Sequence, residues 1–266
     1  MNMKRRNALV AALTSVFLMT AVVGAHAADL LDGVKQRGTL RVALDGTYPP
    51  FNFKENGKLQ GFEVELADAL AKKLGVKAEY TTSEWSAILA GLQAGKYDVV
   101  INQVGITDKR KETFDFSEPY TISSPQLIVR KDEKRDFKTL ADLKGKKLGL
   151  GQGTNFADVA KAVGGIDIRT YPGSTEYLQD LALGRIDAAL NDSLLIPYIV
   201  KKTKLPLKPG APVGELEKSG IPFVKGNPQF KAAIDKALAD IQADGSFAKI
   251  SNKWFDRDVS KPPVAK

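Results

Sequence analysis

Hydrophobic positions along this chain alternate between a strand period and a helix period. Short β-branched runs bounded by glycine or polar residues are typical of buried strands, and apolar residues three or four positions apart are typical of helices that cover a sheet. The expected strands span residues 39–44, 76–80, 97–101, 147–150, 168–171, 186–190 and 219–225. The expected helices span residues 29–38, 62–74, 83–95, 140–144, 156–163, 175–183 and 194–201, with two more around 230–241 and 247–254. Because strands that alternate with helices form parallel sheets, the pattern predicts an α/β fold of open sheets with helices on both faces.

The alternation is interrupted twice, and the interruptions predict two lobes. Residues 121–130 are extended with no helix behind them, and residues 205–216 are rich in proline and glycine without a period. A second strand–helix set lies between these runs. We therefore place lobe 1 at residues 28–122 and 217–266, and lobe 2 at residues 123–216. Two crossings between lobes form a hinge, and the cleft between the lobes is the expected ligand site.

The N-terminus predicts a secretory signal peptide over residues 1–27. A basic start is followed by an apolar run from Ala8 to Val23, and Ala25-His26-Ala27 has the small-x-small form of a cleavage site, so we expect the cut after Ala27 or Ala28. The alternative is a membrane anchor, but the run is shorter than the ~20 residues that a span needs. We expect the mature protein in a periplasm, with a frayed polar tail from Asp258 onward.

Composition excludes several classes of chemistry. The chain has no cysteine, and its single histidine, His26, lies in the predicted signal peptide. Disulfides, thiol catalysis, His–Cys metal sites and Ser–His–Asp triads are therefore excluded from the mature chain, and we expect no metal or other cofactor. Lys4, Arg5 and Arg6 account for three of the eight net positive charges. The remaining basic side chains are interleaved with acidic ones and lack aromatic spacing, so we expect no nucleic-acid partner.

A polar stretch follows the expected strand 97–101. It carries Asn102, Gln103 and Gly105, and then a charged turn that includes Arg110. Open α/β sheets place ligands beyond the carboxyl ends of their strands. The planar guanidinium of Arg110 matches a carboxylate in two parallel hydrogen bonds, which a lysine does not. The alternative interpretation of this charged turn is a solvated loop.

Two other polar stretches stand between an expected strand and the next helix. Gly151-Gln152-Gly153 lacks the third glycine of a dinucleotide fingerprint, and no phosphate-loop lysine follows it. The helix after it begins near Thr154 and Asn155, where free backbone amides and the helix dipole favour an anion; the alternative is a helix cap alone. Residues 191–193 are expected to cap the helix 194–201.

Two adjacent prolines interrupt the chain soon after the first expected strand. Proline fixes the backbone and cannot continue a strand, so we expect an ordered loop. This loop carries Asp45 and Tyr48, and Trp85 lies in the first turn of a later helix. The aromatic rings either pack in the core or form the wall of a pocket.

Several motifs resemble one protein family. They are RVALDGTYPPFNF, GFEVELADALAKKLG, YDVVINQVGITDKRKETFDFSEPY, LKGKKLGLGQGTN, GRIDAALND and DGSFAKISNKWF. In this order they resemble the polar amino-acid family of ABC-transporter solute-binding proteins, over essentially the whole mature chain. The resemblance implies a two-lobe periplasmic-binding-protein fold of type II and a monomer that clamps a free polar amino acid and delivers it to an inner-membrane ABC permease. GTYPPF, VINQV and GTN most resemble cystine-binding members, which favours cystine or cysteine as the ligand.

The resemblance also implies roles for the charged residues. An arginine placed as Arg110 pairs with the α-carboxylate of the ligand, and the amides at Thr154 and Asn155 help to hold it. An aspartate placed as Asp192 takes the α-ammonium. One positive and one negative side chain, each at the end of an element, form both halves of an amino-acid clamp.

Six further positions complete the implied site. Those expected to contribute main-chain groups are Asn102, Gln103 and Gly105. Those expected to contact the ligand side chain are Asp45, Tyr48 and Trp85. Many relatives have serine or threonine where this chain has Gly105, so the ammonium here is expected to depend more on Asp192, carbonyl groups or water.

An enzyme is the alternative function. The same two-lobe fold resembles periplasmic dehydratases that act on prephenate-like acids, in which a carboxylate in the cleft assists elimination. Because the chain has both Arg110 and Asp192, we favour a binding protein over an enzyme.

Overall fold

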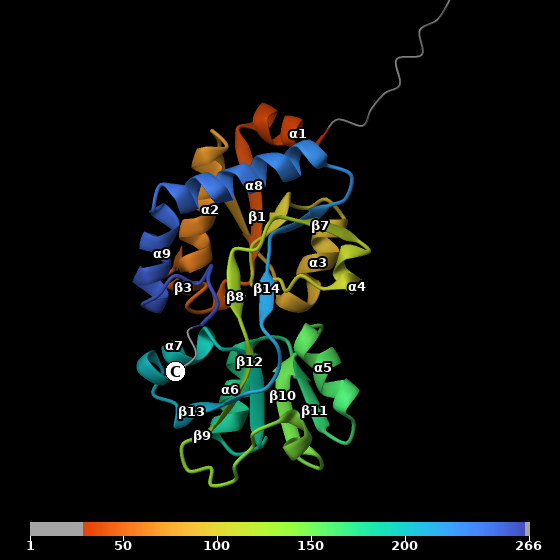
Figure 1. Cartoon of the computed structure of the whole chain (residues 1–266), viewed down its shortest axis with the longest axis vertical. Coiled ribbons are helices and arrows are strands. Elements are labelled where there is room, and N and C mark those ends of the chain that lie inside the picture. The colour runs from red at the N-terminus through yellow and green to blue at the C-terminus, as the bar shows by residue number, and fades with distance from the viewer. Residues whose placement is uncertain (1–28, 264–266) are drawn as a thin grey trace, which may run out of the picture.

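The computed structural model describes residues 29–263 and leaves residues 1–28 and 264–266 undescribed (Figure 1). The predicted signal peptide, with its cleavage site after Ala27 or Ala28, therefore lies outside the described residues. Across residues 29–263, no helix has both the length and the apolar character to cross a membrane.

The first of two lobes is built on a parallel sheet in the order β5-β1-β6. The strands span Thr39–Leu44 (β1), Lys77–Thr82 (β5) and Val99–Val100 (β6). The helices of this part, which we call lobe 1, span Leu30–Arg37 (α1), Phe62–Lys73 (α2), Trp85–Gln93 (α3), Pro228–Ala243 (α8) and Ser246–Phe255 (α9) (Figure 1). Fully buried Phe62 packs edge-on against Phe247, with ring centroids 5.8 Å apart, and this contact joins the C-terminal helices to α2.

The second part, lobe 2, is built on a five-stranded sheet in the order β11-β10-β12-β9-β13. The strands span Pro125–Arg130 (β9), Lys147–Gly151 (β10), Asp167–Tyr171 (β11), Ala188–Asp192 (β12) and Leu207–Pro212 (β13). The helices span Leu140–Leu143 (η1), Asn155–Val163 (α5), Ser174–Ala182 (α6) and Leu195–Lys202 (α7). Strands β10, β11 and β12 are parallel, while β9 runs antiparallel to both β12 and β13, so this sheet is mixed.

Two short antiparallel strands run between the lobes. They are β8 (Thr121–Ser123) and β14 (Glu217–Ser219), which lie side by side in the middle of Figure 1. The division of the chain into residues 28–122, 123–216 and 217–266 falls at these strands and stays a prediction. The expected α/β architecture is confirmed, with helices on both sides of the sheets.

Some elements differ from those expected. Residues 205–216, which have no period, contain β13, because Pro209 and Pro212 lie at the edge of the sheet beside an irregular register. The expected strand 219–225 is two strands, β14 and β15 (Pro222–Val224), and β15 pairs with β7 (Phe114–Phe116). A further small sheet was not predicted; its strands span Thr47–Tyr48 (β2), Asn52–Glu55 (β3) and Lys58–Gln60 (β4).

Two local predictions are wrong. The tail is not frayed at Val259, which is fully buried and whose carbonyl accepts a 2.8 Å hydrogen bond from the Ile122 N–H of β8. One apolar side chain in a polar tail is enough to anchor it. Helix α7 has Leu194 at its N-cap without a side-chain cap, because the helix begins one residue later than expected and Asp192 accepts the N–H of Leu194 itself, at 2.8 Å.

Candidate functional site

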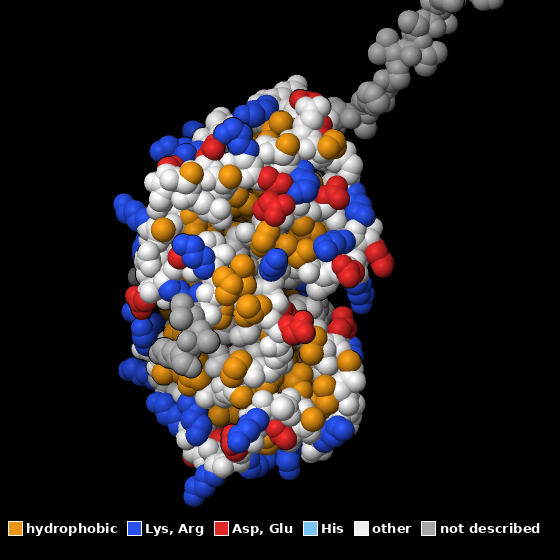
Figure 2. All heavy atoms as spheres, in the orientation of Figure 1, with side chains coloured by type: hydrophobic (Ala, Val, Ile, Leu, Met, Phe, Trp, Pro, Cys, Tyr) orange, Lys and Arg blue, Asp and Glu red, His pale blue; other side chains and the backbone are white. Residues whose placement is uncertain are grey.

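A pocket lies between the two lobes. Seven of the ten predicted site residues line it: Asp45, Tyr48, Trp85, Asn102, Gln103, Thr154 and Asn155. The first five come from lobe 1 and the last two from the start of α5 in lobe 2. The surface is hollowed on the side where α4 (Asp108–Lys111) of lobe 1 faces α5 of lobe 2 (Figure 2). Strand ends and helix starts therefore meet in one place, as expected for an open α/β sheet.

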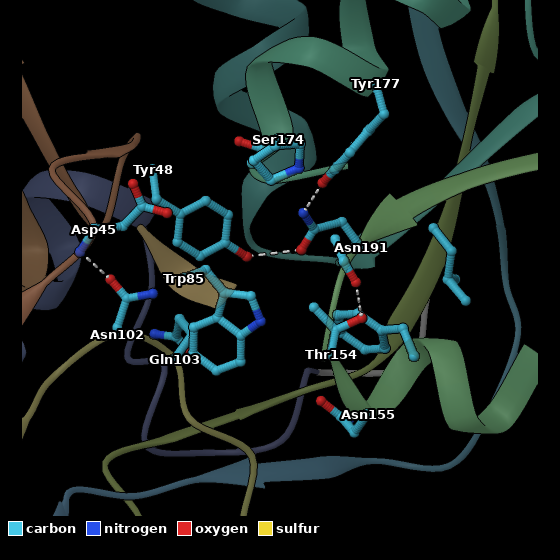
Figure 3. Close-up of a pocket in the computed structure, with 15 residues that line it drawn as sticks. Asp45, Tyr48, Trp85, Asn102, Gln103, Thr154, Asn155, Ser174, Tyr177 and Asn191 are labelled. Carbon is cyan, nitrogen blue, oxygen red and sulfur yellow. Dashed lines mark hydrogen bonds between the residues drawn. The ribbon is translucent and has the colours of Figure 1, made fainter. Parts of the chain in front are cut away.

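The two lobes touch each other across this pocket. The Tyr48 hydroxyl of lobe 1 donates a 2.7 Å hydrogen bond to Oδ1 of Asn191 in lobe 2 (Figure 3). The Asn191 amide nitrogen in turn donates to the hydroxyl of Tyr177, on α6. Burial raises the pKa of Tyr48 well above its usual range, so this hydroxyl keeps its proton. The pocket is thus bounded by a bridge of neutral polar groups.

The N-terminus of α5 presents backbone donors to the pocket. Thr154 is extended at the N-cap position (φ −76°, ψ 151°), and its hydroxyl donates to the Gly151 carbonyl at 2.8 Å instead of capping the helix. Within residues 29–263, no side chain caps the first N–H groups of α5. The residues that carry these groups, Asn155 and Phe156, line the pocket, and the helix dipole favours an anion at this end of α5.

Arg110 lies next to the pocket rather than in its wall. The Thr107 side chain caps α4 by accepting the Arg110 N–H at 3.3 Å, which sets the direction of the arginine. The guanidinium stacks on the Trp85 ring, 5.3 Å from its centroid, and donates to the Gly105 carbonyl at 2.9 Å. Burial lowers its pKa, yet it remains a cation.

The charge of Arg110 is available to an anion. Its second nitrogen reaches the Gly153 carbonyl of lobe 2 at 3.5 Å. In the part of the chain that the structure describes, Arg110 forms no ion pair within 4.0 Å, whereas its neighbour Lys109 faces Asp158 at 3.7 Å. A carboxylate beside α5 would therefore find both a cation and helix amides.

Asp192 is buried behind the wall of the pocket, at the end of β12. Its carboxylate accepts hydrogen bonds from the Ser123 hydroxyl and, at 2.8 Å, from the Leu194 N–H. Burial raises the pKa of Asp192 to about 6. Asn191, its neighbour in the strand, lines the pocket, while Asp192 does not. Asp192 thus carries a poorly solvated negative charge that a cation beside it would stabilise.

Two main-chain groups expected to serve a ligand are already hydrogen-bonded. The Gln103 N–H donates to Oε1 of Glu63 at 2.7 Å, and the Gly105 carbonyl accepts from Arg110. The side chain of Gln103 offers a donor instead. Its oxygen accepts from the Thr121 hydroxyl at 2.8 Å, while its buried amide nitrogen has no hydrogen-bond partner within residues 29–263. A ligand in the pocket would satisfy this nitrogen.

Gly105 leaves a gap between two polar side chains. A Cβ added there would lie 3.4 Å from a guanidinium nitrogen of Arg110 and 3.5 Å from Oδ1 of Asn155. A serine side chain at this position would therefore lie between Arg110 and Asn155. Asn155 is held from its other side by Glu217, at 2.7 Å.

A second hollow continues from the pocket, and its wall is acidic. It shares Asp45, Pro172 and Gly173 with the first pocket. Glu84 and Glu176 also line it, and no lysine or arginine is among its lining residues within the described chain. Burial raises the pKa of Asp45, and the charges of Glu176 and Glu84 add to this effect. This hollow, which we call the acidic chamber, favours a cation.

Sequence reasoning missed eight lining residues, and three of these have polar side chains: Ser174, Tyr177 and Asn191. Ser174 follows a strand and opens α6, the same arrangement that singled out Thr154, so this signal was present. Tyr177 lies inside a helix and resembles a core residue. Asn191 was interpreted only as part of a helix cap. Within residues 29–263, no cluster of three metal-ligating side chains occurs.

Residues 40–257 match the family model of bacterial extracellular solute-binding proteins, family 3. The chain belongs to this family. It is 48% identical to the L-cystine-binding protein TcyJ of Escherichia coli over 87% of this chain and 88% of the relative. It is 36% identical to the L-cystine-binding protein TcyA of Bacillus subtilis, over 88% of this chain and 87% of that one.

A solved structure agrees with the fold. The crystal structure of the ancestral amino acid-binding protein AncCDT-1, a precursor of cyclohexadienyl dehydratase, superposes with a TM-score of 0.80 at 36% identity, covering 85% of this chain and 99% of that one. The periplasmic-binding-protein fold expected from the motifs is thereby confirmed. Because the family is one of solute-binding proteins, the chain is a binding protein and the dehydratase alternative is set aside.

Proposed function

We propose that this chain is the periplasmic binding component of an amino-acid ABC importer and that its ligand is L-cystine. The observation that carries the proposal is the 48% identity to an L-cystine-binding protein over nearly the whole length of both chains. The predicted export signal supports a periplasmic location. We propose that the protein acts as a monomer and passes its ligand to an inner-membrane permease.

The charges around the pocket suit the two charged groups of an α-amino acid. Arg110 and the N–H groups that open α5 are both next to the place where the α-carboxylate would lie. Asp192 would accept the α-ammonium. The carboxylate end therefore faces a fixed positive charge and a helix N-terminus, and the ammonium end faces a buried carboxylate with a raised pKa.

Cystine differs from other amino acids because it carries a second ammonium and a second carboxylate at its far end. The acidic chamber continues from the pocket and offers Asp45, Glu84 and Glu176 to that far ammonium. The far carboxylate would stay toward water at the open side. A cysteine molecule would fill only the inner pocket, so the chamber favours cystine over cysteine.

Binding and release follow from hinge motion. β8 and β14 connect the lobes, and the contacts of Tyr48 with Asn191 and of Arg110 with Gly153 form only when the lobes approach each other. A ligand that contacts both lobes shifts the population toward this closed form, because it binds that form more tightly. The permease would then recognise the closed form.

A thermal-shift screen with calorimetry tests the proposal. Mature protein, stripped of ligand by unfolding and refolding, is titrated with cystine, cysteine, arginine, histidine and glutamine. A ligand at 100 times its Kd adds about 2.7 kcal/mol of stability, which raises Tm by several degrees. The largest shift is expected with cystine. A larger shift with arginine would support amino-acid binding but identify arginine rather than cystine as the ligand. No shift with any of these amino acids would overturn the proposal.

A further inference from the structure

Glu63 is a fully buried carboxylate in the first turn of α2, beneath the pocket. Glu63 is 0% exposed, and within residues 29–263 it forms no ion pair within 4.0 Å. It accepts three hydrogen bonds instead: from the Asn52 amide at 2.6 Å, the Tyr120 hydroxyl at 2.6 Å and the Gln103 N–H at 2.7 Å. A buried ionisable group without a counter-charge is costly, so its presence calls for a role.

One branch of these hydrogen bonds leads to Asp45. Asn52 uses its amide nitrogen twice, donating to Glu63 and, at 2.9 Å, to Oδ1 of Asn102. That oxygen also accepts the Asp45 N–H at 2.7 Å, and Oδ1 of Asn52 accepts the Gly46 N–H at 2.7 Å. Glu63 is therefore connected, through two asparagines, to the loop that carries Asp45 into the pocket and the acidic chamber.

The other branch leads to Gln103 and to the strand between the lobes. Gln103 has φ +48°, in the left-handed region that a residue with a side chain adopts only at a cost. Its N–H is held by Glu63 and, at 3.0 Å, by the Tyr120 hydroxyl. Its side-chain oxygen is held by Thr121, the first residue of β8. The backbone strain at Gln103 is thus compensated by the same carboxylate.

The direction of every hydrogen bond requires a carboxylate at this position. All three groups that face Glu63 donate, and the acceptor of Asn52 is already used by Gly46. A glutamine has the same shape but carries one oxygen and one NH₂ group. Its NH₂ group, a donor, would face one of these three donors, and that hydrogen bond would be lost. An apolar side chain would leave three buried donors unsatisfied.

We propose that Glu63 is a positioning residue for ligand binding, which holds the Asp45 loop and Gln103 in their binding geometry and connects both to β8. This proposal rests on the proposed function, since the ligand is the one that the pocket takes. It differs from a role in core stability because its effect is local to the two loops. It also means that one buried carboxylate is connected both to the ligand site and to β8, the strand that runs between the lobes.

The test compares Glu63→Gln with Asp98→Asn. Asp98 is a matched control, because its carboxylate is also fully buried in lobe 1, but it pairs with Arg37 and Arg41 at the end of β1 away from the pocket. Glu63→Gln is expected to weaken ligand binding about tenfold or more, and Asp98→Asn to leave the Kd within about twofold. Amide hydrogen exchange without ligand is expected to rise at Gly46 and Gln103 in Glu63→Gln only.

Tyr120→Phe keeps the inference testable if Glu63→Gln does not fold. It removes one donor to Glu63 and one acceptor from Gln103, so we expect about a threefold loss of affinity and faster exchange at Gln103. Binding and local exchange that match those of Asp98→Asn would overturn the inference. If the wild-type protein binds none of the ligands, the proposed function fails, whereas the exchange rates at Gly46 and Gln103 still decide the role of Glu63.

Discussion

Tyr48 and Asn191, 143 positions apart in the chain, share a 2.7 Å hydrogen bond that joins the two lobes across the pocket. The amide nitrogen of Asn191 donates a hydrogen bond to the Tyr177 hydroxyl, so the bridge continues into α6. A contact of this kind exists only when the lobes are close together. It therefore contributes to the closed form and not to the open one.

Tyr48→Phe should weaken ligand binding by removing this contribution. The Asn191 oxygen keeps a second donor, the Asp192 N–H at 2.6 Å, so no buried acceptor is left unsatisfied. The loss is therefore that of one neutral hydrogen bond, about 1 kcal/mol or roughly fivefold in Kd. Calorimetry measures it.

Tyr80→Phe is the control, because the Tyr80 hydroxyl bonds Val64 and Asp68 within lobe 1. Equal Kd values for the two variants would mean that the bridge does not contribute to closure.

Arg110→Ala should abolish tight binding. It would leave the ligand carboxylate buried without its cation, which costs ~3–5 kcal/mol, or roughly 10²–10³-fold in affinity. Arg110→Lys should restore part of the loss, since a lysine keeps the charge but not the paired hydrogen bonds.

Lys109→Ala is the matched control for Arg110, because this neighbouring cation is 82% exposed and faces Asp158 rather than the pocket. Titration calorimetry that finds less than about a threefold change for Arg110→Ala would show that the carboxylate lies elsewhere.

Sequence reasoning located site residues mainly by one rule, a polar residue that follows a strand or opens a helix, although Ser174 fits this rule and was missed. Asn102, Thr154 and Asn155 all satisfy that rule, and all line the pocket. Tyr177 does not, because a tyrosine inside a helix has the pattern of a core residue. The partner of a side chain depends on tertiary contacts, so the sequence does not reveal that Glu63 bonds Gln103, 40 positions away.

The fold was predictable as far as it depends on local hydrophobic periods in the sequence. Regular periods identified the strands of the lobe 1 sheet and three strands of lobe 2, β10, β11 and β12. The segment that forms β9 was expected only to be extended. β13 escaped because its two prolines remove the period and its neighbour β9 supplies the pairing. Val259 illustrates the same limit, since a single apolar residue in a polar tail becomes significant only when β8 lies beside it.

The acidic chamber should discriminate between ligands of different length. Replacing both Glu84 and Glu176 with glutamine keeps the shape of the chamber and removes two charges. Cystine should bind about tenfold more weakly, while cysteine, which would not reach the chamber, should change by less than about twofold. Competition binding with both ligands measures the ratio. An equal loss for both would assign the chamber a general electrostatic effect rather than a contact with the far ammonium.

Ligand affinity should fall as the solution becomes acidic, because Asp192 must be ionised to hold an ammonium. Burial raises the pKa of Asp192 in the folded protein to about 6. Below that pH the carboxylate binds a proton, and the ligand must displace it. The contribution of Asp192 to the affinity is therefore complete above about pH 7 and is lost as the pH falls through 6, by about tenfold at pH 5.

Burial also raises the pKa of Glu63, to about 7, so two variants are needed to assign this pH dependence. In Glu63→Gln the part of the loss between pH 7.5 and pH 5 that comes from Asp192 should remain, because Asp192 is unchanged. In Asp192→Asn, binding should be weak at every pH and nearly constant, since the group that titrates against the ammonium is gone. A Kd that does not change from pH 7.5 to pH 5 in the wild-type protein would exclude Asp192 as the partner of the ammonium. A slope that disappears only with Glu63 would instead assign the pH dependence to the positioning of the two loops.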